Sequence, residues 1–359
     1  MKPDDLNPVP MILLGAGASV EAGLPTSLEL VKQVRILLLQ SHSELIPAFD
    51  YFHERLSRVN EQLDIETVYS AVLQVQDAAD KELSLFVERW QPQIKEWTVK
   101  TQGSYWNDTL LNRLAVAIKE LVCRVLWLDL EDSLSKHRVD YLTPLIDWIK
   151  SIEAPVCIST LNFDNVIELG ARIANLPIRN TVFELYDTQE SNFLFPRPST
   201  LDCPTQTEIN HIHGYVECSL GHSDTSDGKP SAGGWPELVY SRPDNPYGSN
   251  PALAFGTQKL ERMIPIVDLL NVFRHRLVQH NVLFVVGYSY RDTHINQCIF
   301  EWQNSSMDFR RIYTISPTAD SLSVSMKSGG FPIRSKLLCM TAGEFYREIP
   351  KLSCEAFHY

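Results

Sequence analysis

The sequence predicts an α/β fold built on a mostly parallel, doubly wound sheet. Short apolar runs at 10–14, 155–160 and 281–286 each end in glycine or polar residues, as buried parallel strands do. A helical pattern resumes after each run, so strand and helix alternate at both ends of the chain. Between the first two runs the periodicity is almost wholly helical. This order indicates a Rossmann-like sheet with a large inserted helical subdomain.

The first half of the chain is predicted to be helical after its opening strand. Thr26-Ser-Leu-Glu29 has the pattern of a capping box, which marks the start of a helix. Apolar side chains then recur at helical spacing over 64–73, 110–125 and 141–149. We therefore predict a catalytic domain of residues 1–26 and 154–359, and a helical insertion subdomain at 27–153.

The predicted insertion is rich in tryptophan. Five of these residues fall within it: Trp90, Trp97, Trp106, Trp127 and Trp148. Most tryptophans in helical segments pack inside the chain, and this is the simpler interpretation. A surface for self-association is the alternative, because tryptophan is enriched at interfaces.

The second half returns to alternating strands and helices. A helix is expected from about Asn165, an extended segment at 209–216, and a helix from about Gln258. A Gly-, Pro- and Ser-rich loop is expected from about 221 to 256, interrupted by a short apolar run at 237–240. Two further strands are expected near the end of the chain, at 311–315 and 336–340.

Composition limits the possible partners and compartments. The formal net charge is −12 and no basic run occurs, so we expect no direct binding of nucleic acid. No apolar run has the length of a membrane helix, and the start of the chain lacks the pattern of a secretory signal. Cys123, Cys157, Cys298 and Cys339 lie in apolar segments and are predicted to be buried thiols. These features together favour a cytoplasmic protein.

Two motifs follow the first two strands of the predicted sheet. Gly15-Ala-Gly-Ala-Ser19 forms a glycine turn that can approach a phosphate closely, although Val20 stands where the dinucleotide fingerprint has a third glycine. A purely structural turn explains the same glycines equally well. Thr160-Leu-Asn-Phe-Asp164 leaves the carboxyl end of its strand, which is where doubly wound sheets bind ligands. Asp164 is equally consistent with a helix N-cap.

Two more motifs follow in the second half. His211-Ile-His-Gly214 places two histidines two residues apart, but no third ligand stands at metal spacing, so we do not expect a metal. Gly287-Tyr-Ser289 is a second glycine turn after a buried strand. Asp292 comes shortly after it, and an ordinary N-cap is its simpler interpretation.

Taken in this order, the four motifs resemble those of the sirtuin (Sir2-like) family. The matching segments are Gly15-Ala-Gly-Ala-Ser19, Thr160-Leu-Asn-Phe-Asp164, His213-Gly214 and Gly287-Tyr-Ser289. Gly23-Leu-Pro-Thr26 and Gly287-Tyr-Ser-x-x-Asp292 resemble the bacterial antiphage-defence branch more closely still. The chain departs from sirtuin deacylases in two respects. It has no Cys-x-x-Cys pair for a structural zinc, and Thr26-Ser-Leu replaces Asp-Phe-Arg after the first loop.

The resemblance implies a role for each matching residue. Gly15, Ala16, Gly17 and Ser19 would hold the pyrophosphate of NAD, and Thr160 would belong to the same binding site. Asn162 would orient the attacking water or the ribose, Asp164 would contact the carboxamide, and His213 would act as general base at the ribose. Gly287 and Ser289 would lie beside the adenine end.

The resulting functional hypothesis is an NAD⁺ hydrolase that needs no zinc and releases nicotinamide and ADP-ribose. Relatives in the antiphage branch exhaust cellular NAD in abortive infection. The resemblance therefore implies gating by a homo-oligomer or by a partner such as a HerA-type ATPase or a short Argonaute. Two alternatives remain: a zinc-free deacylase or ADP-ribosyltransferase, and a non-catalytic subunit that senses NAD.

Overall fold

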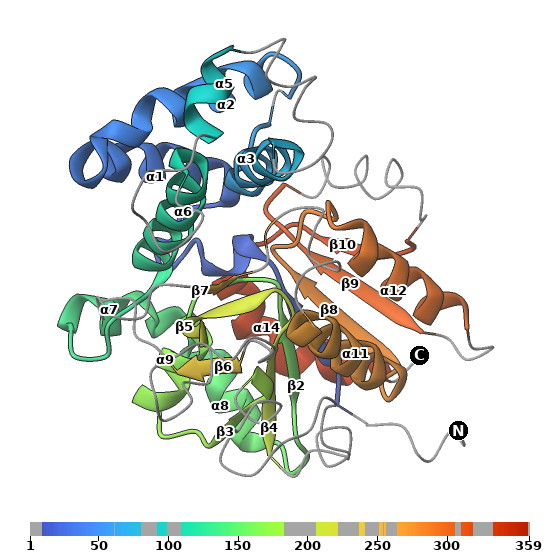
Figure 1. The fold of residues 1–359 in the computed structure, drawn as a ribbon. Helices are drawn as coiled ribbons and strands as arrows, with labels where there is room; N and C mark the ends of the chain where they lie inside the picture. The colour runs from blue at the N-terminus through green and yellow to red at the C-terminus, as the bar shows by residue number, and fades with distance from the viewer. Residues whose placement is uncertain are drawn as a thin grey trace.

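A seven-stranded parallel sheet forms the centre of the computed structural model (Figure 1). The structure describes residues 9–60, 62–79, 92–98, 109–182, 206–221, 237–240, 251–253, 255, 264–305, 310–318 and 333–357. The strands are β1 (Met11–Leu14), β2 (Cys157–Thr160), β3 (Ile178–Asn180), β4 (Thr207–His211), β8 (Val282–Val286), β9 (Arg311–Ile315) and β10 (Lys336–Leu338).

The strand order is β10-β9-β8-β1-β2-β4-β3, and every neighbouring pair is parallel. Strand β1 lies between β2 and β8, with Leu14 opposite Thr160 on one side and Val286 on the other. The chain moves outward from β1 in both directions, so the switch point of this doubly wound sheet is at β1. The predicted fold class is confirmed.

Helices cover both faces of the sheet. Ile12 and Leu14 of β1 pack into one apolar core, which also holds Phe345 of α14 (Ala342–Phe357). Helices α8 (Thr143–Ser151) and α9 (Val166–Ile173) complete this face. Met11 and Leu13 point to the opposite core, which is covered by α11 (Ile264–Val278) and α12 (Thr293–Asn304). The alternation along β1 is the two-residue period of a strand that is buried on both sides.

The remaining helices gather at the top of the view in Figure 1. They are α1 (Ser27–Ser41), α2 (Ile46–Ser57), α3 (Ile65–Ala79), α5 (Pro92–Thr98), α6 (Leu110–Leu126) and, lower down, α7 (Ser133–Arg138). The predicted capping box is present, because the Thr26 backbone N–H donates to Glu29 at 2.9 Å. Since α8 of the same chain segment packs on α9 and α14, the domain boundary at residue 153 stays a prediction.

The tryptophans described in this region pack within the chain. Trp148 is buried in the core, and Trp97 lies edge-on to Tyr51 with ring centroids 5.2 Å apart. Trp127 donates its indole N–H to Glu217 at 3.2 Å. Trp90 and Trp106 lie outside the described residues. These contacts support the interpretation of the three described tryptophans as packing residues, as most helical tryptophans are.

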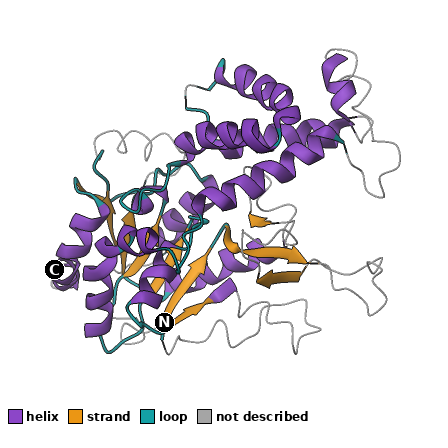
Figure 2. Ribbon diagram, turned by 90° about the vertical axis from the view of Figure 1, so that its left-hand side faces the viewer, coloured by secondary structure: helices purple, strands orange, loops and turns teal. Residues whose placement is uncertain are grey.

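A second, antiparallel sheet extends from the first, as the orange strands at the right of Figure 2 show. Its strands are β5 (Gly214–Gly221), β6 (Glu237–Tyr240) and β7 (Pro251–Leu253). The expectation of a loop at 251–253 is wrong, and β3 is not among the predicted strands, because both strands are only three residues long. Residues 222–236, 241–250, 254 and 256 of the expected loop, and 258–263 of the expected helix, lie outside the described residues.

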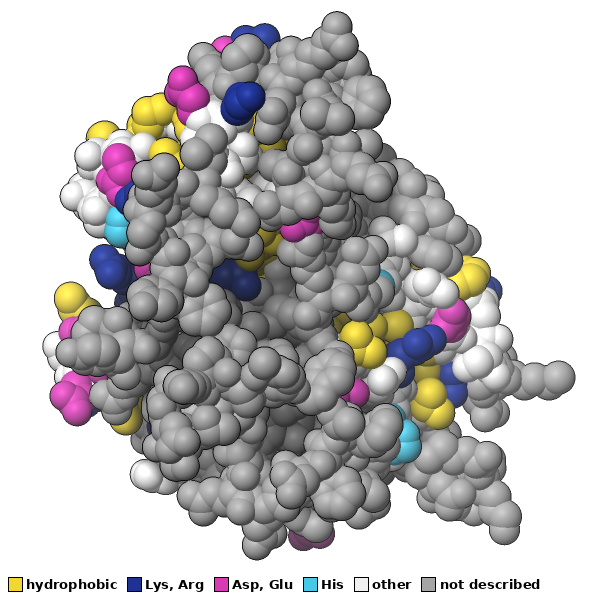
Figure 3. Space-filling model, in the orientation of Figure 1, with side chains coloured by type: hydrophobic (Ala, Val, Ile, Leu, Met, Phe, Trp, Pro, Cys, Tyr) yellow, Lys and Arg dark blue, Asp and Glu magenta, His cyan; other side chains and the backbone are white. Residues whose placement is uncertain are grey.

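On the face shown in Figure 3, the described Lys and Arg side chains lie scattered among acidic and apolar ones. One buried-thiol prediction is wrong: Cys339 is exposed, since β10 is an edge strand, whereas Cys123, Cys157 and Cys298 are buried. Among the described helices, none combines the length and apolarity needed to cross a bilayer.

Candidate functional site

A cavity of about 440 Å³ opens at the carboxyl ends of the central strands. This size is typical of small-molecule sites, which span roughly 300–1,000 Å³. All the predicted site residues except Thr160 line it: Gly15, Ala16, Gly17, Ser19, Asn162, Asp164, His213, Gly287 and Ser289. Four segments far apart in sequence are therefore brought to one place by the sheet, as the switch-point rule predicts.

The two glycine turns pack against each other. A Cβ atom on Gly17 would lie 2.8 Å from the Cα of Gly287, and Gly287 itself has a φ of +65°. The N–H groups of Gly15 and Gly17 donate to the carbonyls of Val286 and Gly287, both at 2.9 Å. These glycines therefore allow the two backbone segments to approach closely. Their N–H groups are already used in hydrogen bonds within the protein. Ala16 and Ser19, in the short 3₁₀ helix that follows Gly15, remain the candidate phosphate contacts from this loop.

Asn162 connects the second motif to the first. Its side-chain Nδ2 donates to the carbonyl of Gly15 and to Oγ of Ser19, both at 3.0 Å. Among the described residues, no hydrogen bond uses its Oδ1, and the side chain lines the cavity. The amide is thus fixed by its nitrogen while its oxygen can accept a hydrogen bond from a ligand or water.

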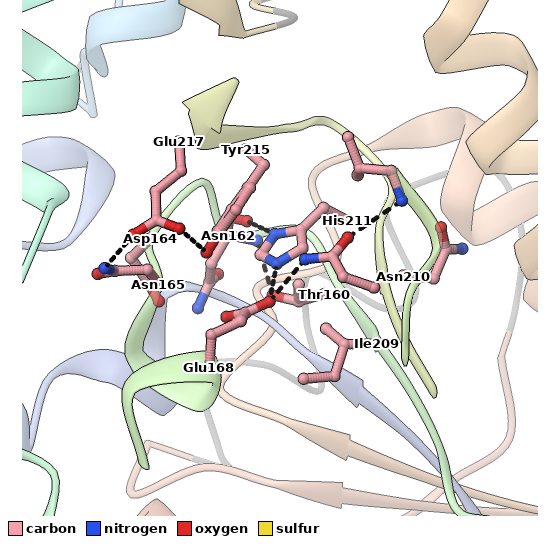
Figure 4. A network of polar contacts seen from close by, with 12 residues as sticks. Thr160, Asn162, Asp164, Asn165, Glu168, Ile209, Asn210, His211, Tyr215 and Glu217 are labelled. Carbon is pink, nitrogen blue, oxygen red and sulfur yellow. Dashed lines mark hydrogen bonds and ion pairs between the residues drawn. The ribbon is translucent and has the colours of Figure 1, made fainter. Parts of the chain in front are cut away.

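A buried polar network supports Asn162 from behind (Figure 4). Thr160 Oγ1 accepts the N–H of Asn162 at 3.0 Å, so Thr160 lies behind the site and does not line the cavity. His211 Nδ1 donates to the Asn162 carbonyl at 3.1 Å, and its Nε2 lies 2.6 Å from Glu168 Oε1. Burial alone would lower the pKa of His211, but Glu168 and the Asn162 carbonyl raise it overall. A charged imidazole that donates from both nitrogens fits this environment. His211 therefore supports the backbone of Asn162 from behind the site.

Asp164 is a buried carboxyl group at the same edge. It accepts the N–H of Val166 at 3.2 Å and a hydrogen bond from the Ser19 hydroxyl. Burial raises its pKa to about 6, against the hydrogen bonds that lower it. The helix-cap interpretation is therefore partly right, since Asp164 bonds a backbone N–H at the start of α9, but its side chain also lines the cavity.

This pKa yields a prediction about stability. The folded state raises the pKa of Asp164, so folding favours the protonated carboxyl group. The stability that this group contributes is therefore fully present below the ordinary pKa of 3.8 and is lost as the pH rises through about 6. The loss amounts to roughly 3 kcal/mol. Asp164→Asn should remove it, so the stability of the variant relative to the unmodified protein should grow between pH 4 and pH 7. Denaturant unfolding at several pH values measures this, and a constant difference would refute the assignment.

His213 follows β4 and is buried, with its ring directed to a second histidine. Its Nε2 lies 3.1 Å from Nε2 of His294, on the first turn of α12. Asp292 completes a group of three whose candidate ligand atoms all lie within 4.8 Å of one another. The expectation that no third ligand accompanies the His213 motif is corrected, because the fold brings His294 of α12 and its N-cap residue Asp292 beside His213 from a distant part of the sequence. The sequence signal that could have indicated them is the i, i+2 spacing of Asp292 and His294 directly after the Gly287-Tyr-Ser289 motif.

The helical region forms one wall of the cavity. Ile65 and Glu66 of α3 and Leu126 of α6 line it together with the strand ends. Arg291, in the turn between β8 and α12, lies 3.9 Å from Asp64 just before α3. The site is therefore shared between the sheet and the segment that was predicted to be an insertion.

Residues 156–328 match the family model of the SIR2-like domain. Similar solved structures include a Sir2 homologue mutant in complex with ADP-ribose, 13% identical, with a TM-score of 0.43 over 99% of this chain and 98% of that one. Another is a Sir2 homologue in complex with NAD, 14% identical, with a TM-score of 0.44 over 96% and 89%. No curated protein sequence matches the chain.

Proposed function

The chain contains a SIR2-like domain, and on that premise we propose that it binds NAD⁺ in the cavity and hydrolyses the nicotinamide–ribose bond. The observation that carries the proposal is the convergence of Asn162, Asp164 and His213 on this one cavity beside the Gly15–Ser19 loop. Three of the four motifs, those with Asn162, His213 and Gly287, fall within the matched region 156–328.

The chemistry requires few groups. Cleavage of the nicotinamide–ribose bond passes through an oxocarbenium-like transition state, as in glycosides. Nicotinamide leaves as a neutral molecule because the bond electrons return to its cationic ring, so no general acid is needed. A water O–H bond then breaks as its oxygen bonds to the ribose carbon, and His213 takes the proton. Asn162 Oδ1 would orient that water or the ribose, and Asp164 would contact the carboxamide of nicotinamide.

The pyrophosphate is assigned to the first loop and the adenine end to the second turn. Ser19 and Ala16 would contact phosphate, while Gly287 and Ser289 would lie next to the adenosine. Thr160 would act indirectly, by holding the backbone of Asn162. The absence of any Cys-x-x-Cys pair favours hydrolysis over zinc-supported deacylation.

The first experiment incubates the purified chain with NAD⁺ and separates the products. Nicotinamide and ADP-ribose in equal amounts support the proposal. Acyl-ADP-ribose in the presence of an acylated peptide would indicate a deacylase, and labelled protein an ADP-ribosyltransferase. Binding of NAD⁺ without turnover, alone or with a partner, would indicate a sensing subunit.

Control of the activity is part of the proposal. A constitutive NAD hydrolase would deplete its own cell, so we propose that assembly or a partner gates this chain in antiphage defence. The wall formed by α3 and α6 supports this, because a partner that contacts those helices can change the cavity directly. The candidate partners are a second copy of the chain, a HerA-type ATPase or a short Argonaute.

Gating yields a measurable prediction. Light scattering is expected to show a homo-oligomer or a larger complex, and the specific rate of NAD⁺ hydrolysis should rise with protein or partner concentration. Turnover by a monomer at nanomolar concentration, at full rate and unaffected by any partner, would contradict it.

Metal content provides a further prediction. We expect less than one zinc ion per chain, because the sequence lacks the paired cysteines of a structural zinc site. Elemental analysis of protein purified without chelators measures this. About one zinc ion per chain that is kept in His294→Gln, and so is not held by the group of His213, Asp292 and His294, would refute the prediction and restore the deacylase alternative.

A further inference from the structure

His213 is hydrogen-bonded to another imidazole. The Nε2 atoms of His213 and His294 are 3.1 Å apart, and the ring centroids are 5.3 Å apart. Two ring nitrogens at this distance share one proton, because one must donate and the other must accept. The protonation of His213 is therefore tied to that of His294. His294 is not among the residues that the sequence motifs assign to the site.

Asp292 occupies the N-cap position of α12 without capping the helix by its side chain. Its backbone is extended, and no side-chain hydrogen bond to the first turn is present. A carboxylate at this position usually accepts a backbone N–H two or three residues on. Here the side chain lies instead in the group with His213 and His294, and it lines the cavity. Its position in the group indicates an electrostatic role toward the two imidazoles.

We propose that His294 and Asp292 extend His213 into a three-residue acid–base group that serves the reaction of the same cavity. In this group His294 is a positioning residue, which orients the His213 ring through the Nε2–Nε2 hydrogen bond. Asp292 offsets the positive charge that the imidazole pair gains when it takes a proton. The inference rests on the proposed function for its kinetic consequences, but the geometry of the group exists without any substrate.

The proton balance is simple. The O–H bond of water breaks, an N–H bond forms on the imidazole pair, and the charge of the pair changes from neutral to +1. The carboxylate of Asp292 carries −1 within 4.8 Å, so the cationic pair is not left uncompensated beside the oxocarbenium-like ribose. This arrangement stabilises the state in which water has become a nucleophile.

Other charged groups line the same cavity or lie on the helices α11 and α12. The same cavity is lined by Glu21, Glu66, Asp164 and Arg291. Helix α11, which packs against α12, carries Asp268, and its Arg274 is ion-paired with Glu301 of α12 at 2.9 Å. These groups remain in every variant described next, so differences between variants report on Asp292 and His294.

The test measures the His213 imidazole directly. Protein labelled with ¹⁵N in its histidines is titrated by NMR without NAD⁺, as the unmodified chain and as Asp292→Asn, His294→Gln and His294→Ala. His275→Ala is the matched control, since His275 is an exposed histidine on α11 that contacts Gln279. Thermal unfolding of each variant confirms that it is folded.

The proposal expects the His213 titration midpoint to move to lower pH in Asp292→Asn and in His294→Ala, with no change in His275→Ala. It also expects kcat to fall about tenfold or more in these two variants while KM changes little, since general-base catalysis typically contributes 10²–10⁴-fold. His294→Gln, which keeps an amide hydrogen-bond partner, should recover part of the kcat lost in His294→Ala.

Two results would overturn the proposal. The first is a His213 titration that is the same in Asp292→Asn and His294→Ala as in the unmodified chain. The second is a divalent ion such as Zn²⁺ bound at one per chain and lost in His294→Gln, which would make the group a metal site. The His213 titration midpoint can shift as expected while the unmodified chain shows no NAD⁺ turnover under any assay condition. In that case the proposed function fails and the coupling of the three residues stands.

Discussion

Replacing Asn162 or His213 by alanine is expected to abolish NAD⁺ hydrolysis while the fold survives. Asn162→Ala removes the oriented carbonyl oxygen in the cavity, and His213→Ala removes the base. Loss of either kind of group typically lowers the rate 10²–10⁴-fold. Turnover measured by nicotinamide release, alongside circular dichroism and thermal unfolding, checks both expectations.

Two neighbouring variants serve as comparisons. His211→Ala should have a milder effect on turnover, because His211 does not line the cavity and its ring nitrogens bond the Asn162 carbonyl and the Glu168 carboxylate. Asp164→Ala should weaken NAD⁺ binding as well as turnover, because its side chain lines the cavity and bonds Ser19. Near-normal activity in a folded Asn162→Ala or His213→Ala protein would show that the residue is wrongly assigned.

Gly287→Ala should disrupt the site through the backbone. The new Cβ would lie 2.3 Å from the nitrogen of Ala18 and 2.6 Å from the Cα of Gly17, at a φ of +65°. Left-handed backbone costs an L-residue about 1–2 kcal/mol, and overpacking adds about 1–3 kcal/mol. We therefore expect a loss of stability of roughly 2–5 kcal/mol together with loss of NAD⁺ binding, because the Gly15–Ser19 loop must move.

Gly23→Ala is the matched control for this variant. Gly23 also has a positive φ, +72°, but its nearest neighbour would be the flexible side chain of Arg138 at 3.4 Å. It should show the backbone cost alone and keep NAD⁺ binding. Denaturant unfolding and calorimetric titration with NAD⁺ separate the two effects, and equal behaviour of the two variants would show that the contact between the glycine turns is unimportant.

The sequence predicted the sheet because its strands are buried on both faces. β1 and β8 are continuous apolar runs, and β2 begins with Cys157-Ile158 before its polar end; such segments are recognisable without any partner. β3 and β7 have three residues each and were missed. Both are defined by pairing with a neighbouring strand, and the sequence of a single segment does not reveal such pairing. The exposed Cys339 was missed for the same reason: edge position depends on strand order.

The site was partly predictable for a similar reason. Asn162, Asp164 and His213 follow strand ends, and parallel strands bring their carboxyl ends to one edge. His294 and Asp292 were not found, because their contact with His213 depends on how α12 packs against the sheet. Nor could the sequence show that the N–H groups of Gly15 and Gly17 donate hydrogen bonds to the carbonyls of Val286 and Gly287.

The most direct test of the central claim is product formation from NAD⁺ by the full chain, alone and with a candidate partner, against Asn162→Ala as the inactive reference. The account predicts free nicotinamide and ADP-ribose in equal amounts from the unmodified protein under at least one assembly condition, and neither above background from the variant. Failure to release nicotinamide under every assembly condition, or equal release by the Asn162→Ala protein, would contradict it.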